Sequence, residues 1–237
     1  MKVKEQFCKW AKEYHNSSII QQKCAKILVE HLPKDIGSVL DLGCGSGRVY
    51  EQILEQKRNY TNFLGVDFSK DMLMLHKKGK NVKLIEGDFN QQELYNLLGN
   101  SFDTIVSASA LQWANDLELV FKNTSSKASF GAFFLFGSNT FKTIHKIAEV
   151  NSPIFDIEYI KESFNKYYTP NKIELYNFKL EFNSTLDMLR YIKKSGVSGG
   201  GFGLKFSQIN KILKEYPYNY LEFETILLVG ESKKSKN

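Results

Sequence analysis

One short stretch decides the fold, Asp41-Leu42-Gly43-Cys44-Gly45-Ser46-Gly47. It follows an apolar strand-like segment, residues 38–40, and precedes an amphipathic segment, residues 48–56. Glycines at alternate positions let the backbone turn sharply and approach a ligand closely, because no side chain stands in the way. The acidic residue at the end of the strand disfavours a phosphate ligand. It favours a ligand with a cationic or hydroxyl-rich part.

The glycine turn alone does not identify the ligand, because dinucleotide-dependent dehydrogenases also have one. The spacing here is G-x-G-x-G, whereas the dinucleotide fingerprint is G-x-G-x-x-G. A second apolar segment, residues 62–67, ends in Asp67. This acid follows the last glycine by about 20 residues, where a ribose-binding carboxylate is expected. Two further strand-like segments follow at residues 82–88 and 102–109. The four segments together predict a nucleoside-binding α/β domain.

Strand and helix patterns alternate through the first 140 residues. Apolar segments near 38–43, 62–67, 82–88, 102–109 and 131–138 alternate with helical patterns near 47–57, 70–78, 90–98 and 115–126. This alternation predicts a parallel sheet that is covered on both faces and has right-handed crossovers. Ligands of such sheets bind at the carboxyl ends of the strands. The glycines, Asp67, Asp88 and Ser107 are all expected at that edge.

The two ends of the chain have other patterns. Residues 7–32 have helical periodicity, and Pro33 and Gly37 interrupt the chain before the first strand. The later segments are predicted as a helix at 141–150, a mixed region at 153–166, a strand at 172–182, helices at 184–194 and 206–215 on either side of a flexible glycine-rich loop at 195–203, and a closing strand at 221–230.

Composition favours a soluble enzyme. The 237 residues are 42% hydrophobic, enough for one large domain with a substantial core. No apolar run is long enough to cross a bilayer, and the first residues lack the apolar core of a signal peptide. The three cysteines are scattered without zinc spacing, so we expect reduced thiols, no metal and a cytoplasmic protein. The net charge of +6 favours an acidic partner; no nucleic-acid-binding motif is present.

The motif series resembles the class I S-adenosylmethionine-dependent methyltransferases over residues 36–137. The resemblance implies an α/β, Rossmann-like fold with a mostly parallel seven-stranded sheet, helices on both faces and a helical lid from the N-terminus and an insertion. It also implies S-adenosyl-L-methionine as cofactor and S-adenosyl-L-homocysteine as product. The expected units are an N-terminal helical lid (1–35), the cofactor-binding core (36–140), a lid or insertion with acceptor-side elements (141–220), a closing strand (221–230) and a disordered basic tail (231–237).

Three segments outside the core resemble the malonyl-acyl-carrier-protein O-methyltransferases of biotin synthesis. They are residues 7–14 with Gln21 further on, residues 109–113, and residues 188–197. The Leu111-Gln112-Trp113 part is shared with trans-aconitate methyltransferases, so the segment at 188–197 discriminates better. One departure is His15, where the family has an acidic residue after the tyrosine. The resemblance implies a monomeric enzyme that methylates the free carboxylate of malonyl-acyl carrier protein and binds neither nucleic acid nor membrane.

The class I resemblance also implies the cofactor-binding residues. Asp41 would hold the ammonium group of the cofactor, directly or through water, and Asp67 would accept hydrogen bonds from both ribose hydroxyls. The other expected contacts are Gly43, Cys44 and Gly45 against the amino-acid part, Phe68 and Met72 on the adenine, Asp88 at the adenine amino group, Phe89 beside the ring, and Ser107 and Ala108 on the floor. Plainer roles exist for several of these residues: Asp67 as a helix cap, Asp88 as a turn residue, and Phe89 and Met72 as core.

Three residues are candidates on the acceptor side. A carboxylate acceptor is already ionised at neutral pH, so no general base is needed. Arg190 is the candidate that holds this carboxylate, with Lys193 and Lys194 as neighbours on the same helix. Tyr14 is expected to close the cofactor pocket, and Trp113 to lie on the acceptor side. Each could instead be an ordinary surface or packing residue.

Three alternatives remain open on the sequence. A methyltransferase for a free small acid such as trans-aconitate would share the core and differ in its acceptor. A non-catalytic module that binds S-adenosylmethionine or RNA would be expected to have lost some of the motif residues, yet Asp41, Gly43, Gly45, Asp67 and Asp88 are all present. A nucleotide-dependent oxidoreductase is disfavoured by the glycine spacing.

Overall fold

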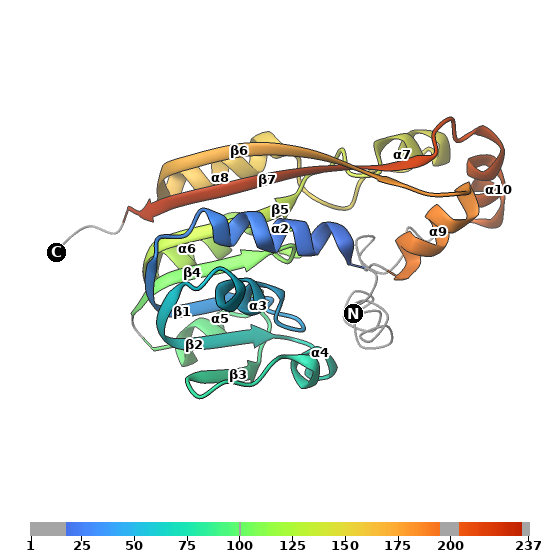
Figure 1. The fold of residues 1–237 in the computed structure, drawn as a ribbon. Helices are drawn as coiled ribbons and strands as arrows, with labels where there is room; N and C mark the ends of the chain where they lie inside the picture. Colours follow the sequence, from blue (N-terminus) through green and yellow to red (C-terminus); the bar gives the residue numbers. More distant parts are fainter. Residues whose placement is uncertain (1–17, 100, 195–203, 234–237) are drawn as a thin grey trace.

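A single twisted sheet organises the protein (Figure 1). The computed structural model describes residues 18–99, 101–194 and 204–233. Within these ranges the sheet has seven strands in the order β3-β2-β1-β4-β5-β7-β6. The strands are β1 (Asp35–Leu42), β2 (Asn59–Asp67), β3 (Val82–Glu86), β4 (Phe102–Ala108), β5 (Ala128–Phe136), β6 (Tyr168–Glu181) and β7 (Tyr220–Ser232). The first five strands pair in parallel, and β7 runs antiparallel to both neighbours. The expected mostly parallel, seven-stranded fold is confirmed.

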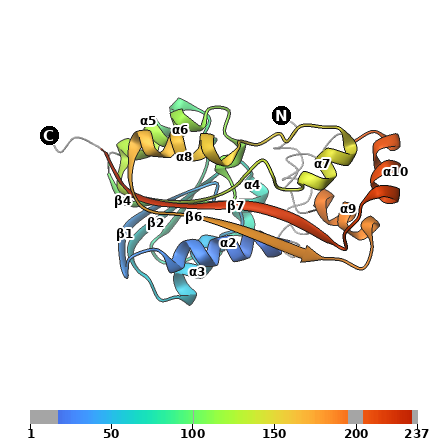
Figure 2. The ribbon, with the colours of Figure 1, turned by 90° about the horizontal axis from the view of Figure 1, so that it is seen from above.

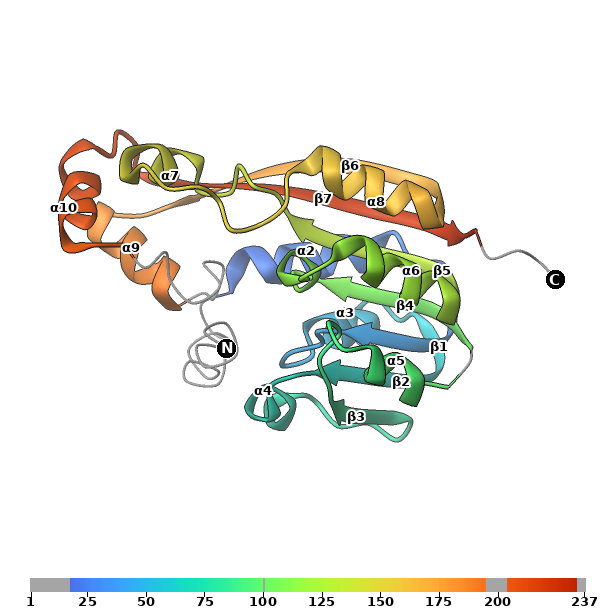
Figure 3. The same cartoon turned by 180° about the vertical axis from the view of Figure 1, so that it is seen from behind.

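Helices cover both faces of the sheet (Figures 2 and 3). On one face lie α2 (Ile19–Glu30) and α3 (Arg48–Glu55), and on the other lie α5 (Gln92–Leu97), α6 (Leu117–Lys127) and α8 (Ile157–Tyr167). Strand β5 shows why two layers are needed. Its Phe133 and Leu135 belong to one hydrophobic core, and Phe134 and Phe136 belong to the other. Successive side chains of a strand point to opposite faces, so a strand that is apolar throughout must be covered twice.

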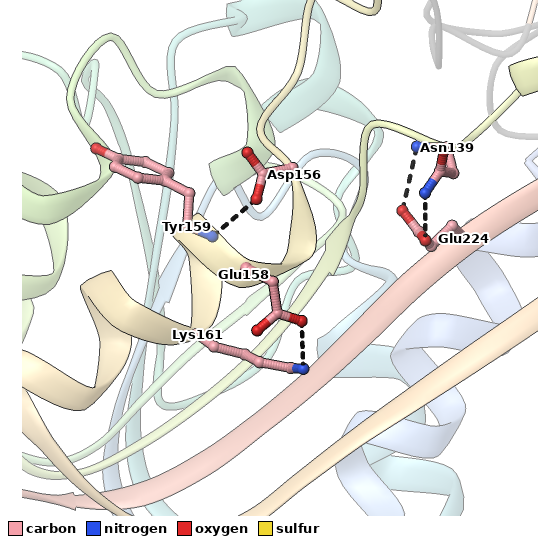
Figure 4. Close-up of polar contacts among 6 residues, drawn as sticks. All are labelled: Asn139, Asp156, Glu158, Tyr159, Lys161 and Glu224. Atoms are coloured by element: carbon pink, nitrogen blue, oxygen red, sulfur yellow. Dashed lines mark hydrogen bonds and ion pairs between the residues drawn. The ribbon is translucent and has the colours of Figure 1, made fainter.

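Side-chain caps begin several of the helices. Asp116 accepts a hydrogen bond from the Leu119 amide at the start of α6, at 2.9 Å. Asp156 does the same for the Tyr159 amide at the start of α8, also at 2.9 Å (Figure 4). The region 153–166, which looked mixed in sequence, therefore contains a capped helix. Its buried residues Ile157, Ile160 and Phe164 are three and four positions apart and so share one helical face.

The N-terminal part is described only in its second half. Of the helical pattern at 7–32, residues 19–30 form α2, which packs against α3 and the sheet, and residues 1–17 lie outside the described ranges. The lid, its boundaries and the nature of the tail at 231–237 stay predictions. No helix in the described ranges is long and apolar enough to cross a membrane.

The last two strands form an arm that projects past the rest of the sheet. β5 ends at Phe136, which pairs with Thr225, whereas β6 and β7 continue to pair as far as Glu181 and Tyr220. Three helices lie at the end of this arm (Figures 1 and 3): α7 (Lys142–Ala148), α9 (Thr185–Lys194) and α10 (Phe206–Glu215). Because β5 ends at the carboxyl edge of the parallel strands, the arm extends on the side where ligands of this sheet bind.

Replacing Phe133 tests the hydrophobic core between β5, α6, α8 and the start of β6. The Phe133 ring is fully buried and contacts the rings of Phe121, Phe164 and Tyr168, with centroid distances of 5.2, 6.1 and 5.5 Å. We expect Phe133→Ala to lower the free energy of unfolding by about 3–5 kcal/mol, because it leaves a cavity among these rings. Urea denaturation measures the loss. Leu175→Ala is the control, since Leu175 on β6 is 48% exposed and should cost little. Equal losses in the two variants would contradict this account of the core.

Candidate functional site

The glycine turn is fixed by hydrogen bonds to the neighbouring strand. The amides of Gly43 and Cys44 both donate to the Val66 carbonyl oxygen of β2, at 2.8 and 3.0 Å. Gly43 and Gly45 have φ values of 71° and 53°, a left-handed conformation that favours glycine. A Cβ on Gly43 would lie 2.3 Å from the Ala110 Cβ. The turn therefore needs its glycines for conformation and for close approach.

An open cavity lies over this turn at the carboxyl ends of β1, β2 and β4; its empty space, counted together with the solvent at its mouth, is about 690 Å³. Its walls come from five regions of the chain: α2, the glycine turn with the start of α3, the end of β2 with α4 (Lys70–Leu75), the end of β3, and the end of β4 with the following 3-10 helix. The lining residues are Gln21, Gly43, Cys44, Gly45, Ser46, Arg48, Val49, Asp67, Phe68, Met72, Phe89, Ala108, Ser109, Ala110 and Trp113. Nine of the predicted site residues are among them.

Asp67 is the best-positioned polar group of the cavity wall. One carboxylate oxygen accepts from the Gly45 amide at 2.9 Å, and the other accepts from the Ser69 amide at 2.8 Å. The second bond is the helix-cap role considered above, and it leaves lone pairs on both oxygens. Burial raises the pKa of Asp67 to about 6, although the two amides oppose the shift. The carboxylate is thus held rigidly and can accept two more hydrogen bonds.

Asp41 lies close to Asp67 in the core rather than on the cavity wall. Its side chain is fully buried, and neither carboxylate oxygen has a hydrogen-bond partner among the described residues. Burial raises the pKa of Asp41 well above its usual range, and the nearby Asp67 raises it further. A buried carboxyl without a partner is costly. The site is therefore poised to gain from a cationic group or a donor near Asp41.

Three other predicted residues have local partners. Asp88 accepts from the Asn90 amide and side chain at 2.9 and 3.0 Å, which is the turn role considered above, and it does not line the cavity. Ser107 is buried and donates to the Leu42 carbonyl at 2.6 Å, so it ties β4 to β1 just below the cavity. The Cys44 thiol is buried, and desolvation holds its pKa well above the usual range, so it remains protonated. Phe89 and Met72 are nearly fully buried and also line the cavity.

The three acceptor-side candidates lie in different parts of the chain relative to the cavity. Trp113 lies in the 3-10 helix Leu111–Trp113 and lines the cavity. Arg190 lies on α9 in the arm, away from the cavity lining, with a side chain 64% exposed and an ion pair to Asp187 at 3.0 Å. Tyr14 lies outside the described residues. The structure therefore brings only Trp113 to the cavity among the described candidates, and the roles of all three stay predictions.

Four polar residues of the cavity wall were given no role from sequence: Gln21, Ser46, Arg48 and Ser109. Arg48 is the only lysine or arginine among the described lining residues. It pairs with Glu51 at 3.4 Å. Its position directly after the last glycine was the available signal. Ser109 has a φ of 61°, a strained conformation for a residue with a side chain. Its amide donates to the Phe134 carbonyl at 2.8 Å, which fixes the turn after β4.

The comparisons with known proteins agree with this geometry. The family described as "Methyltransferase domain" matches residues 33–197. A malonyl-[acyl-carrier protein] O-methyltransferase from Calditerrivibrio nitroreducens is 28% identical over 82% of this chain and 79% of that protein. A second protein of this name, from Ilyobacter polytropus, is 25% identical over 95% of this chain and 92% of that protein.

A solved structure shares the fold at lower identity. The Haemonchus contortus phosphoethanolamine N-methyltransferase 2, in complex with S-adenosylhomocysteine, has a TM-score of 0.58 and 16% identity. The match covers 96% of this chain and 60% of that chain. The strand order with an antiparallel β7, the glycine turn after β1 and the family match all agree. The chain therefore belongs to the methyltransferase-domain family and is a class I S-adenosylmethionine-dependent methyltransferase.

Proposed function

We propose that this methyltransferase esterifies the free carboxylate of malonyl-acyl carrier protein, an early step of biotin synthesis. One observation carries the choice of a carboxylate acceptor. Among the described lining residues, the ionisable side chains are Cys44, Arg48 and Asp67. The thiol is kept protonated, the guanidinium cannot take a proton, and the remaining lone pairs of Asp67 are assigned to the ribose hydroxyls of the cofactor. A cavity without a free base suits an acceptor that is already ionised. The named relatives point to the same class of acceptor.

The cavity wall fits the cofactor well. Asp67 offers two acceptor oxygens to the ribose hydroxyls, and Phe68, Met72 and Phe89 offer apolar surface to the adenine. The glycine turn leaves room for the amino-acid part, in space that side chains would fill. Asp41 would gain a counter-charge from the ammonium group, directly or through water. When bound, the cofactor would supply an electrophilic methyl carbon to a carboxylate oxygen; the carbon–sulfur bonding pair would stay on sulfur, and no proton would need to move.

The chain's own contribution is positioning and exclusion of water. Alignment of the two reactants supplies much of the rate gain in a displacement of this kind. The negative carboxylate and the positive sulfonium lose their charges as the methyl group is transferred. An apolar cavity therefore lowers the barrier of this reaction relative to water. Trp113 and Ala110 are the apolar residues that follow β4, next to the strained Ser109, and would face the acceptor. The hydrogen bond that holds the turn at Ser109 would thereby set the position of the acceptor relative to the cofactor.

We propose that Arg48, with Gln21 beside it in the cavity wall, binds the carboxylate of the cofactor's amino-acid part. Arg48 begins α3 directly after the glycine turn, where that part would lie. Its guanidinium is a planar group of N–H donors whose geometry matches a carboxylate. A hydrogen bond to a charged group contributes about 1.5–3 kcal/mol. Arg48 would therefore add to affinity for the donor rather than for the acceptor.

The ribose role of Asp67 predicts a pH dependence. The pKa of Asp67 is about 6 in the free protein, and ionised oxygens are needed to accept from the hydroxyls. Protonation below that pKa therefore weakens binding. The affinity for S-adenosylhomocysteine should fall about tenfold from pH 7 to pH 5, as expected for one protonation at this pKa. Calorimetry at several pH values measures it. Asp67→Asn should bind weakly at all pH values without this slope; an unchanged slope would assign the titration to another group, such as Asp41.

The Arg48 role predicts a selective loss. Arg48→Gln should weaken S-adenosylhomocysteine binding by about tenfold or more, because a charged hydrogen bond is lost. It should leave 5′-methylthioadenosine binding unchanged, since that ligand lacks the amino-acid part. Lys70→Gln is the control, because Lys70 is exposed at the start of α4 and does not line the cavity. Equal losses for the two ligands would mean that Arg48 shapes the cavity and does not bind the carboxylate.

The acceptor is tested by methyl transfer from labelled S-adenosylmethionine. The substrates to compare are malonyl-acyl carrier protein, malonyl-coenzyme A, free malonate and trans-aconitate. We expect a base-labile methyl ester mainly on the carrier-protein thioester. Esterification of trans-aconitate or malonate alone would keep the cofactor site and replace the proposed acceptor by a free acid. Binding of S-adenosylhomocysteine without transfer to any of the four would contradict a carboxyl methyltransferase with this acceptor range.

A further inference from the structure

We infer that the helical end of the arm, formed by α7, α9 and α10, is the docking surface for an acidic carrier protein. We call it the basic tip and define it by residues 142–149, 185–193 and 205–215. The inference rests on the proposed function, because that function requires a protein-borne thioester. None of the described residues that line the cavity belongs to the tip.

The tip is placed beyond the cavity-bearing edge of the sheet (Figure 1). The last pair of β5 is Phe136–Thr225, and five further residue pairs of β6 and β7, from Asn177–Glu224 to Glu181–Tyr220, lie past it. At about 3.4 Å per residue, the arm reaches roughly 17 Å past β5. A carrier protein holds its acyl group at the end of a long tether. A docking surface beside the cavity edge, and not over the cavity, suits that delivery.

Hydrogen bonds hold the tip together and to the arm. The side-chain amide and backbone amide of Asn139 donate to the Glu224 carboxylate of β7, at 2.8 and 3.1 Å (Figure 4). The Thr143 amide of α7 donates to the Glu222 carboxylate at 3.1 Å. The Gln208 side chain of α10 donates to the Ala148 carbonyl at the end of α7, at 2.7 Å. These bonds fix α10 to α7 and α7 to β7, and two acids of β7 are engaged beneath them.

The tip is strongly basic. Counting the side chains that the structure describes, it has seven cations against three acids, a net charge of +4 where the whole chain has +6. The cations are Lys142, Lys146, Arg190, Lys193, Lys205, Lys211 and Lys214, and the acids are Glu149, Asp187 and Glu215. Two ion pairs, Arg190–Asp187 and Lys211–Glu149, leave five exposed lysines that pair with no acid among the described residues. An acidic partner would be steered to this surface.

An apolar anchor lies among these lysines. Phe206, the first residue of α10, is 79% exposed, and Leu213 is 40% exposed. The two are seven positions apart and so lie on the same face of the helix. Exposed aromatic side chains within a charged rim are typical of protein-binding surfaces, where the aromatic residue contributes most of the affinity. The combination fits a folded acidic protein with a small apolar patch.

The test is a matched pair of charge reversals. Lys146→Glu with Lys214→Glu changes two exposed lysines of the tip, on α7 and α10. Lys83→Glu with Lys122→Glu changes two exposed lysines on β3 and α6, with the same effect on net charge. Phe206→Ala tests the anchor. The measurements are the Kd for malonyl-acyl carrier protein by fluorescence anisotropy, the kcat/KM for that protein and for malonyl-pantetheine, and the Kd for S-adenosylhomocysteine.

We expect the tip variants to weaken carrier-protein binding and to lower its kcat/KM by about tenfold, with a steeper loss at low salt. Their kcat/KM for malonyl-pantetheine and their affinity for S-adenosylhomocysteine should not change. Equal losses in the tip and control variants would mean that the net charge of the protein, and not this surface, determines binding, and would overturn the inference. Wild-type affinity in both tip variants would overturn it while leaving the proposed function intact. Failure of the unmodified protein to bind or methylate the carrier protein would remove the proposed function, and the inference with it.

A membrane is the competing partner for a basic surface with an exposed phenylalanine. Flotation with phosphatidylglycerol vesicles separates the two. We expect no difference between the tip and control variants in this assay. Loss of vesicle binding in the tip variants, with carrier-protein binding unchanged, would assign the surface to lipid and overturn the inference.

Discussion

The Val66 carbonyl oxygen is the acceptor on which the site depends. The amides of Gly43 and Cys44 in the glycine turn both donate hydrogen bonds to this one atom. The turn is thereby held against β2, and the residue after Val66 is Asp67, whose carboxylate in turn accepts from the Gly45 amide. Three hydrogen bonds thus join two strand ends. They set the distance between the part of the cavity that would take an amino acid and the part that would take a ribose.

This arrangement has an electrostatic cost. Asp41 and Asp67 are both buried, burial raises the pKa of both carboxyls, and the nearby Asp67 raises the pKa of Asp41 further. Asp67 has two amides to oppose this cost, and Asp41 has no hydrogen-bond partner among the described residues. A ligand with a cationic group and hydroxyl donors would relieve both carboxyls at once. We therefore expect the protein to gain stability on binding such a ligand. The free site is shaped for binding rather than for stability.

The sequence predicts the sheet and most of the cavity wall because both depend on local patterns. Alternating apolar segments specify parallel strands, and in a parallel sheet their carboxyl ends must meet, so the glycine turn, Asp67 and Phe89 could be placed together. Arg48 directly follows the glycine turn and could have been placed with it, whereas Gln21 could not be placed this way. Gln21 reaches the wall because α2 packs on one face of the sheet against α3, β4 and β5, and that contact joins residues more than 20 positions apart. The fixed turn at Ser109 has the same origin, since its amide bonds to β5.

The arm shows where sequence patterns stop being informative. The helix around Arg190 and the strands on either side of it could be recognised, yet their place relative to the cavity depends on how far β6 and β7 pair beyond β5. That length is decided by the register of two long strands, which no local pattern fixes. The two parts of the sheet therefore have different structural roles. The parallel part of the sheet forms the cavity, whereas the antiparallel pair β6–β7 extends beyond β5 to the helices α7, α9 and α10. A methyl donor is small enough to be bound entirely by the first part. The proposed acceptor, carried on a protein, would be too large for that cavity, and the arm would then offer a second surface without changing the first.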